Sequence, residues 1–137
     1  MANTNEERIL EDGWRYAIVQ LTGKVDSSDV SLLPAVQLSE FTNNEPRSTL
    51  VGFRIDEIEF SVAEPLTLFL AWNAATPQQF ASLAQSGEMH YRKQGGLQPD
   101  RLRSGYDGNI NLTTGGYIPG MVVGYTILLK MVKLYVF

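Results

Sequence analysis

Four carboxylates lie close together in the middle of the chain, at Asp56, Glu57, Glu59 and Glu64. Two carboxyl groups that flank a glycosidic bond can act as the acid and the base of glycoside hydrolysis. In an extended strand, however, the neighbours Asp56 and Glu57 point to opposite faces unless a β-bulge intervenes. We therefore interpret these carboxylates first as a solvated edge of a sheet, and a small glycosidase is the alternative.

The single histidine, His90, lies between Glu88 and Arg92, and the chain contains no cysteine. The usual zinc sites need several histidine or cysteine ligands, so they cannot be built from this sequence. The glycine pairs at 95–96 and 115–116 belong to loops between strands and do not lead into a helix as phosphate-binding loops do. We interpret His90 as a polar residue on a solvent-facing surface rather than a general base, and we expect no cofactor and no enzymatic activity.

The segment Asp107-Gly-Asn-Ile-Asn111 offers oxygen ligands of the kind that bind calcium. It lacks the glycine at the sixth position and the closing glutamate of an EF-hand loop. Because Asp-Gly-Asn is also typical of a simple turn, we expect a turn without a metal ion here.

Aromatic residues raise the possibility of a carbohydrate-binding module, because sugar rings stack on exposed aromatic rings. Trp14 and Trp72 share strand faces with aliphatic residues, which favours packing in the core. Tyr106 and Tyr117 lie in expected loops. If the protein binds a sugar, these two tyrosines are the candidate stacking residues.

A basic set, Arg92, Lys93, Arg101 and Arg103, lies in or beside an expected long loop at residues 93–107. The whole chain is acidic, with a formal net charge of −4, whereas nucleic-acid binders carry clustered positive charge. The set therefore favours a protein partner with an acidic patch. A loop that is merely solvated by its charges is the alternative.

The strongest strand signal covers residues 115–133, which include the longest apolar run. Alternate side chains from Tyr125 to Met131 would line one face, and those from Thr126 to Val132 the other. Both faces are largely apolar, which predicts a central strand, or a strand whose second face is covered by another layer or another chain.

Shorter strands are predicted at residues 14–25, 49–62, 66–72 and 109–113, where apolar residues recur with a period of two. The alternation slips by one residue between Ile18 and Val19, and again at Asp56-Glu57, and a β-bulge would explain each slip. Residues 76–84 begin with Thr76-Pro77 and fit either a helix or an irregular extended segment.

About eight strands with turns between them predict an all-β fold, a single-domain antiparallel β-sandwich with a jelly roll as the leading topology. The length of 137 residues suits one domain. Residues 1–13 are mostly polar and are expected to form an N-terminal arm or a short helical turn, so that the sandwich comprises residues 14–137.

The chain closes on four successive apolar residues, Leu134, Tyr135, Val136 and Phe137. Chain termini usually fray, and an apolar tail at 134–137 therefore suggests packing against a second subunit or a larger assembly. The alternative is that the tail completes the last strand over its own core.

The second half of the chain resembles a group of small bacteriophage structural proteins, some of which are similar to capsid cement or decoration proteins. The likeness is carried by Leu70-Ala-Trp-Asn-Ala-Ala-Thr-Pro77, Leu83-Ala-Gln-Ser-Gly-Glu-Met-His-Tyr-Arg92, Gly95-Gly-Leu97, Gly108-Asn-Ile-Asn-Leu-Thr-Thr114, Gly116-Tyr-Ile-Pro-Gly120 and Tyr125-Thr-Ile-Leu-Leu-Lys130. These segments cover about half of the chain.

This resemblance implies a non-enzymatic virion protein that binds the major capsid protein on the outside of a phage shell and stabilises it. It also implies a homo-oligomer, with a trimer as the expected form. No apolar run reaches the roughly 18–20 residues that span a bilayer, and the N-terminal residues lack the pattern of a signal peptide. We therefore expect synthesis in the host bacterial cytoplasm, with neither a membrane nor nucleic acid as a partner.

Overall fold

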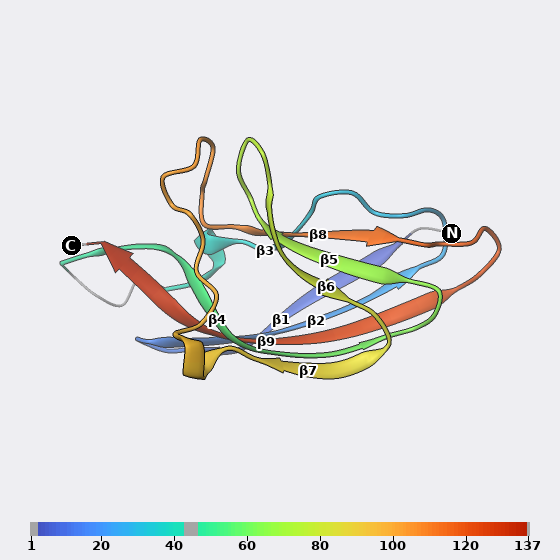
Figure 1. Cartoon of the computed structure of the whole chain (residues 1–137), viewed down its shortest axis with the longest axis horizontal. Coiled ribbons are helices and arrows are strands. Elements are labelled where there is room, and N and C mark those ends of the chain that lie inside the picture. The colour runs from blue at the N-terminus through green and yellow to red at the C-terminus, as the bar shows by residue number, and fades with distance from the viewer. Residues whose placement is uncertain (1–2, 43–46, 137) are drawn as a thin grey trace.

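The computed structural model describes residues 3–42 and 47–136, which form nine strands in two antiparallel sheets that pack face to face (Figure 1). The first sheet contains, in spatial order, β1 (Thr4–Asp12), β2 (Tyr16–Val25), β9 (Val123–Val136), β4 (Thr49–Val62) and β7 (Ser86–His90). The second contains β3 (Leu33–Val36), β8 (Ile110–Gly115), β5 (Thr67–Trp72) and β6 (Gln78–Leu83). Two short 3₁₀ turns, η1 (Leu38–Glu40) and η2 (Arg92–Gln94), lie in the connections.

The strand pairing is that of a jelly roll. β2 pairs with β9, β3 with β8, β4 with β7 and β5 with β6, so the chain forms one long antiparallel ribbon. The additional pairs β4–β9 and β5–β8 roll this ribbon into two layers. β1 is an extra strand at the edge beside β2. The predicted antiparallel β-sandwich is confirmed.

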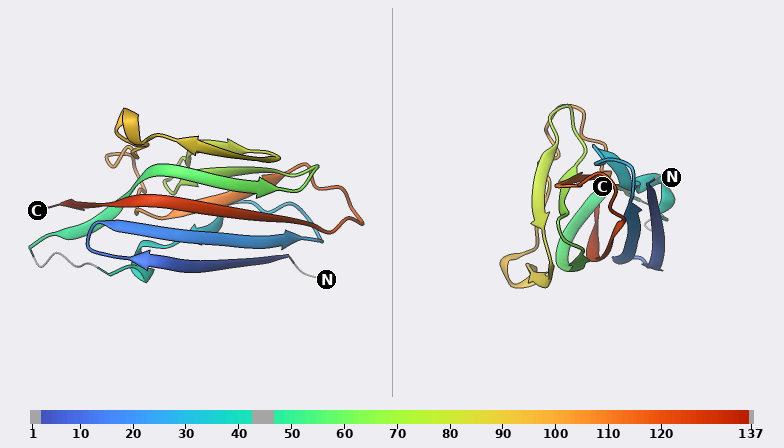
Figure 2. Two further views of the ribbon diagram at one scale, coloured as in Figure 1. Left: turned by 90° about the horizontal axis from the view of Figure 1, so that it is seen from below. Right: turned by 90° about the vertical axis from the view of Figure 1, so that its right-hand side faces the viewer.

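The core lies between the sheets and is organised around β9, which has β2 on one side and β4 on the other (Figure 2). The inward side chains of β9, from Tyr125 to Met131 at every second position, are buried, as the alternation predicts. They pack with fully buried residues of both sheets: Leu21, Phe53, Ile55, Ile58, Leu68, Leu70, Leu83, Ile110 and Leu112. Each such side chain stabilises the fold by roughly 1.5–3 kcal/mol. The central position predicted for this strand is confirmed.

One of the two predicted β-bulges is present. Ile55 lies opposite Met131 and Glu57 opposite Lys130, so Asp56 is an extra residue in β4. The bulge predicted between Ile18 and Val19 is wrong, because β2 pairs with β9 without any shift of register.

In β2 the core face is Ala17, Val19 and Leu21, which are fully buried. Tyr16 and Ile18 instead lie on the outer face of the sheet, where Tyr16 is exposed and Ile18 half-buried. The apparent slip in the sequence thus reflects apolar residues on both faces of one regular strand.

The N-terminal arm predicted at residues 1–13 is instead a strand over residues 4–12. β1 pairs with β2 from Thr4↔Lys24 to Asp12↔Ala17 and contains its own bulge between Ile9 and Glu11. Its polar composition hides the strand in the sequence, because an edge strand needs few apolar residues, and charged side chains protect it from pairing with other chains.

The helix considered for residues 76–84 is also absent, since Gln78–Leu83 form β6 at the edge of the second sheet. Ala81 and Leu83, two residues apart, are buried there. Within residues 3–42 and 47–136 no helix is long and apolar enough to cross a membrane.

Candidate functional site

The outer face of the five-stranded sheet carries a row of side chains that come from five different strands. The pairing registers align Glu11, Ile18, Lys130, Glu57 and His90 in this order across β1, β2, β9, β4 and β7. Such a row depends on pairing between residues up to 112 positions apart, as between Ile18 and Lys130, so it is not visible in the linear sequence. It unites one of the predicted carboxylates with the only histidine.

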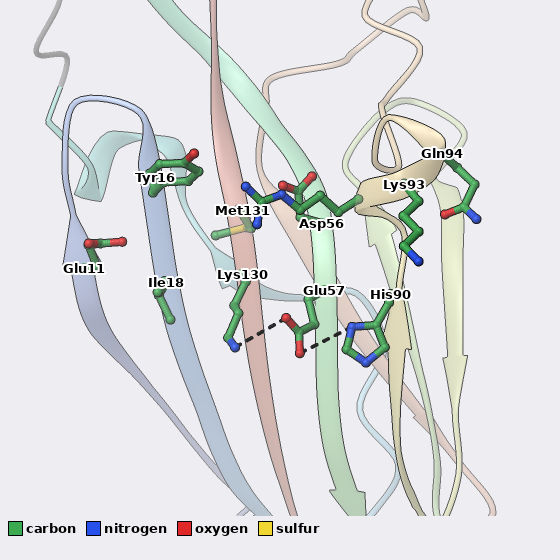
Figure 3. Close-up of a pocket in the computed structure, with 11 residues that line it drawn as sticks. Glu11, Tyr16, Ile18, Asp56, Glu57, His90, Lys93, Gln94, Lys130 and Met131 are labelled. Atoms are coloured by element: carbon green, nitrogen blue, oxygen red, sulfur yellow. Dashed lines mark ion pairs between the residues drawn. The ribbon is translucent and has the colours of Figure 1, made fainter.

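Glu57 forms ion pairs with both of its neighbours in this row (Figure 3). One carboxylate oxygen lies 3.4 Å from Nζ of Lys130, and the other lies 3.6 Å from Nδ1 of His90. The hydrogen bond to Glu57 is the main reason that the pKa of Lys130 is raised above its ordinary value, and Glu59, 3.6 Å away, adds to it. Nε2 of His90 also lies 3.1 Å from Glu88. Glu57 is therefore held in place from both sides.

The sheet edge predicted at residues 56–64 is wrong for Glu57 and Glu59, because β4 is flanked there by β9 and β7. Glu64 follows the end of β4 and is exposed, as predicted. Asp56 is buried in the bulge and accepts two hydrogen bonds from Arg54, at 2.9 and 3.2 Å. Both Asp56 and Glu57 thus take part in ion pairs, and neither stands free as an acid or a base.

The carboxylates of Glu57 and Glu88 and a ring nitrogen of His90 lie within 4.8 Å of one another. These three groups are the residues that could hold a divalent cation among those the structure describes. Lys130 competes for the same Glu57 carboxylate, and Glu88 and His90 are both exposed.

A groove of about 640 Å³ runs along this face. Tyr16 and Ile18 form its wall on β2, the ion-paired Glu57 and Lys130 lie in its middle, and the η2 turn with Lys93 and Gln94 closes the far side (Figure 3). The bulge predicted between Ile18 and Val19 would have kept Tyr16 and Ile18 on the core side of the sheet. The slip in alternation at residues 18–19 was the signal that could have identified them as surface residues.

The predicted basic set is divided between two places. Arg92 and Lys93 belong to η2 and line the groove. Arg101 and Arg103 lie further along the loop, where Arg103 is 3.9 Å from Asp100.

The loop that carries Arg101 and Arg103 is fixed by hydrogen bonds along its length. Leu97 and Ile55 exchange backbone hydrogen bonds of 2.8 and 2.9 Å. Gln78 bonds Asp100 through both ends of its amide, at 3.0 Å each, and the N–H of Ala75 donates to Ser104 at 2.8 Å. The predicted surface loop is therefore attached to both sheets.

The loop and the end of β9 meet at a second hollow, of about 630 Å³, which we call the loop–tail surface. Its lining consists of Val51, Pro99, Asp100, Arg101, Leu102, Tyr106 and Val136. Leu102 is 96% exposed and Val136 48% exposed. Two of the predicted interface segments, the basic loop and the apolar tail, are thus brought together here.

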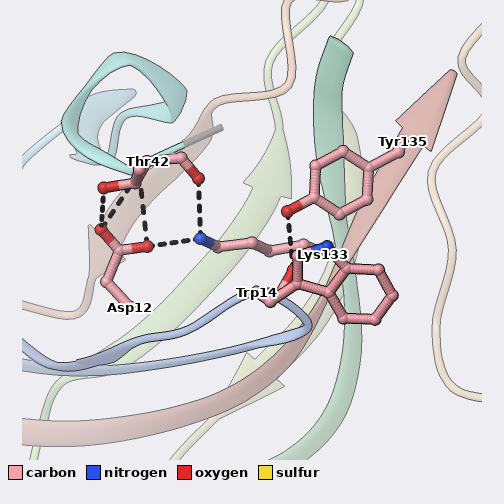
Figure 4. A network of polar contacts seen from close by, with 5 residues as sticks. All are labelled: Asp12, Trp14, Thr42, Lys133 and Tyr135. Atoms are coloured by element: carbon pink, nitrogen blue, oxygen red, sulfur yellow. Dashed lines mark hydrogen bonds and ion pairs between the residues drawn. The ribbon is translucent and has the colours of Figure 1, made fainter. Parts of the chain in front are cut away.

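The apolar tail continues β9 as far as Val136. Tyr135 pairs with Leu50 and Leu134 with Gly52 on β4, and both side chains are half-buried. The hydroxyl of Tyr135 donates to the carbonyl oxygen of Trp14 at 2.7 Å (Figure 4). Leu134 and Tyr135 thus belong to the strand, Val136 reaches the surface, and Phe137 lies outside the described residues.

A buried ion pair holds the start of this tail. The ammonium of Lys133 has no exposed side-chain surface and donates to the carboxylate of Asp12 and, at 2.8 Å, to the carbonyl oxygen of Thr42 (Figure 4). Burial alone would raise the pKa of Asp12, but the hydrogen bonds from Lys133 and Thr42 outweigh it, so this pKa is below its ordinary value. The contact joins β1, β9 and the segment that follows η1.

The two tyrosines predicted to stack on a sugar do not form one platform. Tyr106 precedes β8 and Tyr117 follows it, so they lie beyond opposite ends of that strand. The hydroxyl of Tyr106 donates to Val51 at 2.9 Å, and that of Tyr117 to Met121 at 3.0 Å. Both rings are half-buried, and burial raises the pKa of Tyr106 to about 12.

The two tryptophans differ. Trp72 is buried, and its ring lies 4.2 Å from that of Phe80, as a core residue should. Trp14 is 57% exposed in the β1–β2 turn, so its predicted place in the core is wrong.

Of the segment predicted as a turn, residues 107–109 contain a bend at Gly108, and Ile110 and Asn111 are already the first two residues of β8. Asp107 accepts hydrogen bonds from the backbone N–H of Asn109 at 3.0 Å and from the side chain of Asn73 at 2.8 Å. Gly108 has φ +87°, a conformation that suits glycine.

Comparison with known proteins adds no relative: no family model, no curated protein and no solved structure matches the chain.

Proposed function

We propose that this chain is a non-enzymatic phage virion protein that binds the outer surface of a capsid and stabilises the shell. Its partners in this role are the major capsid protein and further copies of itself, with a trimer as the expected assembly. The proposal starts from the resemblance of the second half of the chain to small phage structural proteins, and the geometry of the loop–tail surface supports it.

The observation that carries the proposal is the exposure of Leu102 on a fixed loop. Single exposed apolar residues are common on protein surfaces and need no explanation. Leu102, however, is almost fully exposed, lies between Arg101 and Arg103, and borders a hollow that also contains Val136. Arginine is enriched in interface hot spots, so an exposed apolar side chain between two arginines supports a binding role for this loop.

The hydrogen bonds that attach the loop at Leu97, Asp100 and Ser104 support a binding role further. A loop that is ordered before binding loses little conformational entropy when it docks, so more of the contact energy is retained as affinity. The arginines also suit a partner with an acidic patch, as the sequence predicts.

A homo-oligomer would strengthen such a contact. One loop–tail surface is small, but several copies that engage neighbouring capsid subunits together would gain avidity without any new contact. Such avidity would allow a chain of 137 residues to stabilise a shell through small contacts.

Co-sedimentation with empty shells of the phage that encodes the protein tests the proposal. We expect the wild-type protein to pellet with the shells at saturable stoichiometry and to raise the temperature at which the shells break. Native mass measurement of the free protein is expected to give three copies. A protein that stays in the supernatant at every shell concentration contradicts the proposal.

A further inference from the structure

We propose that the groove on the outer face of the five-stranded sheet is a binding site for a neutral oligosaccharide. This site is separate from the loop–tail surface and shares none of its lining residues. It also differs from the sugar site predicted at Tyr106 and Tyr117, since its aromatic wall is Tyr16.

The charge of the groove selects a neutral ligand. Its lining contains three acidic side chains, Glu11, Asp56 and Glu57, and three basic ones, Arg92, Lys93 and Lys130, so the formal charges cancel. The groove has no excess of positive charge that would attract a polyanion such as a nucleic acid, and no excess of negative charge that would attract a cationic ligand. Many polar groups without net charge suit a ligand that is rich in hydroxyl groups.

The polar groups in the middle of the groove are ordered before any ligand arrives. Lys130 and His90 hold Glu57, and Arg54 holds Asp56 with two hydrogen bonds. Each carboxylate oxygen can accept more than one hydrogen bond, so a fixed carboxylate can still accept from a sugar hydroxyl. Groups that are already fixed lose little entropy on binding, which favours affinity for a ligand that makes only hydrogen bonds and ring contacts.

Tyr16 provides the apolar part of the site. Tyr16 is 42% exposed as a residue and lies beside the half-buried Ile18, at the β2 side of the groove (Figure 3). Aromatic rings combine a large apolar face with a polar hydroxyl, which suits the alternating apolar and polar surfaces of a pyranose. An apolar wall on one side and polar groups on the other is typical of small-molecule sites.

The length of the groove indicates an oligosaccharide rather than a single sugar. Its lining extends from Glu11 on β1 to η2 beyond β7, across five strands. Strands lie about 4.8 Å apart, so four intervals give a span of roughly 19 Å. A chain of several sugar units lying across the strands would contact both Tyr16 and Gln94.

Isothermal titration calorimetry with neutral tetrasaccharides tests the proposal on the full chain. The probes are cellotetraose, maltotetraose and tetra-N-acetylchitotetraose, which separate β-glucan, α-glucan and N-acetylated sources, and an acidic tetragalacturonate is the comparison. We expect at least one neutral probe to bind more tightly than tetragalacturonate. Tyr16→Ala and Glu57→Gln are each expected to weaken that binding at least tenfold.

Trp14→Ala is the matched control, because Trp14 is an exposed aromatic residue that does not line the groove, and alanine keeps the backbone carbonyl that accepts the hydrogen bond from Tyr135. It is expected to leave the affinity unchanged. Binding of no neutral probe, preference for the acidic probe, or equal losses in the Tyr16 and Trp14 variants would overturn the proposal. Glu57→Gln retains the size of the side chain and provides the test if Tyr16→Ala does not fold.

Discussion

Replacement of Asp12 by alanine should be among the most destabilising single changes on the polar surface of this protein. Asp12 is the anionic partner of Lys133, whose side chain has no exposed surface. Without it, the ammonium of Lys133 would remain buried, with the carbonyl oxygen of Thr42 as its remaining hydrogen-bond acceptor in the described contacts. Breaking a buried pair in this way costs about 3–5 kcal/mol.

The lower end of that range applies here, because the Asp12 side chain is 22% exposed and water can approach the site once it is removed. A loss of about 3 kcal/mol is a large part of the 5–15 kcal/mol that stabilises a typical domain, and it corresponds to a fall in Tm of roughly 10 °C. Urea unfolding monitored by the fluorescence of Trp72 and Trp14 would measure it.

The double variant Asp12→Ala with Lys133→Met is the control. It removes both charges, and a methionine fills the space of the lysine stem, so most of the lost stability should return. A cost below about 1 kcal/mol for Asp12→Ala, or a double variant as unstable as the sum of the two single variants, would contradict the buried ion pair.

The same carboxylate should make the fold sensitive to acid. Because the pKa of Asp12 in the folded protein is below the ordinary value of 3.8, the charged form stabilises the fold above that pH. This stabilisation is lost as the pH falls through the folded-state pKa. The difference in unfolding free energy between wild type and Asp12→Asn should therefore shrink on acidification below pH 4, and a constant difference would refute this cause.

Three further predictions concern stability. Burial, together with the nearby Glu40, raises the pKa of Glu7 from 4.5 to about 8, so the protonated form stabilises the fold fully below pH 4.5 and this contribution disappears as the pH rises to 8. Allowing for screening by solvent, Glu7→Gln should raise the free energy of unfolding by roughly 1–2 kcal/mol at pH 9 and by little at pH 5. Equal changes in urea unfolding at both pH values would exclude the titration of Glu7 as the cause. Tyr106→Phe removes the donor to the Val51 carbonyl and should cost about 1 kcal/mol, with faster amide exchange in residues 97–108; unchanged exchange there would argue against this anchor. Gly108→Ala should lower Tm more than Gly120→Ala, although both glycines have positive φ. A Cβ at residue 108 would lie 2.7 Å from the backbone oxygen of Val51, whereas a Cβ at residue 120 would have no atom within 4 Å. Equal losses of Tm would refute the close approach at residue 108.

The fold was largely predictable because the strongest strands alternate with a clear period. β9 and β5 show this best, and the slip at Asp56 marks a real bulge. β1 was not predictable, because an edge strand that buries little surface needs no apolar pattern. The secondary structure of residues 78–83 was ambiguous because Thr76-Pro77 suits the start of a helix. These residues form a strand because they pair with β5, which is a contact that the local sequence does not show.

The candidate sites were predictable only in part. The sequence indicated the arginines on either side of Leu102 and the apolar tail as interface residues. That Leu102 and Val136 line the same hollow depends on how the loop folds back over the start of β4. The ion-paired row through Glu57 arises from the register of β2, β9, β4 and β7, which is set by contacts distant in sequence. Tyr16 was not predicted as a surface residue, because the slip in alternation at residues 18–19 was interpreted as a bulge rather than as apolar residues on both faces of one regular strand.

Quantitative co-sedimentation of wild type, Leu102→Ser and Leu10→Ser with empty shells tests the proposed capsid contact most directly. Leu10 is the matched control, an exposed leucine on β1 that does not line the loop–tail surface. Burial of a leucine stabilises a contact by about 1.5–3 kcal/mol, so Leu102→Ser should weaken shell binding at least tenfold. Leu10→Ser should bind as wild type does. Undiminished binding by Leu102→Ser, or equal losses in both variants, would contradict a capsid contact through the loop–tail surface.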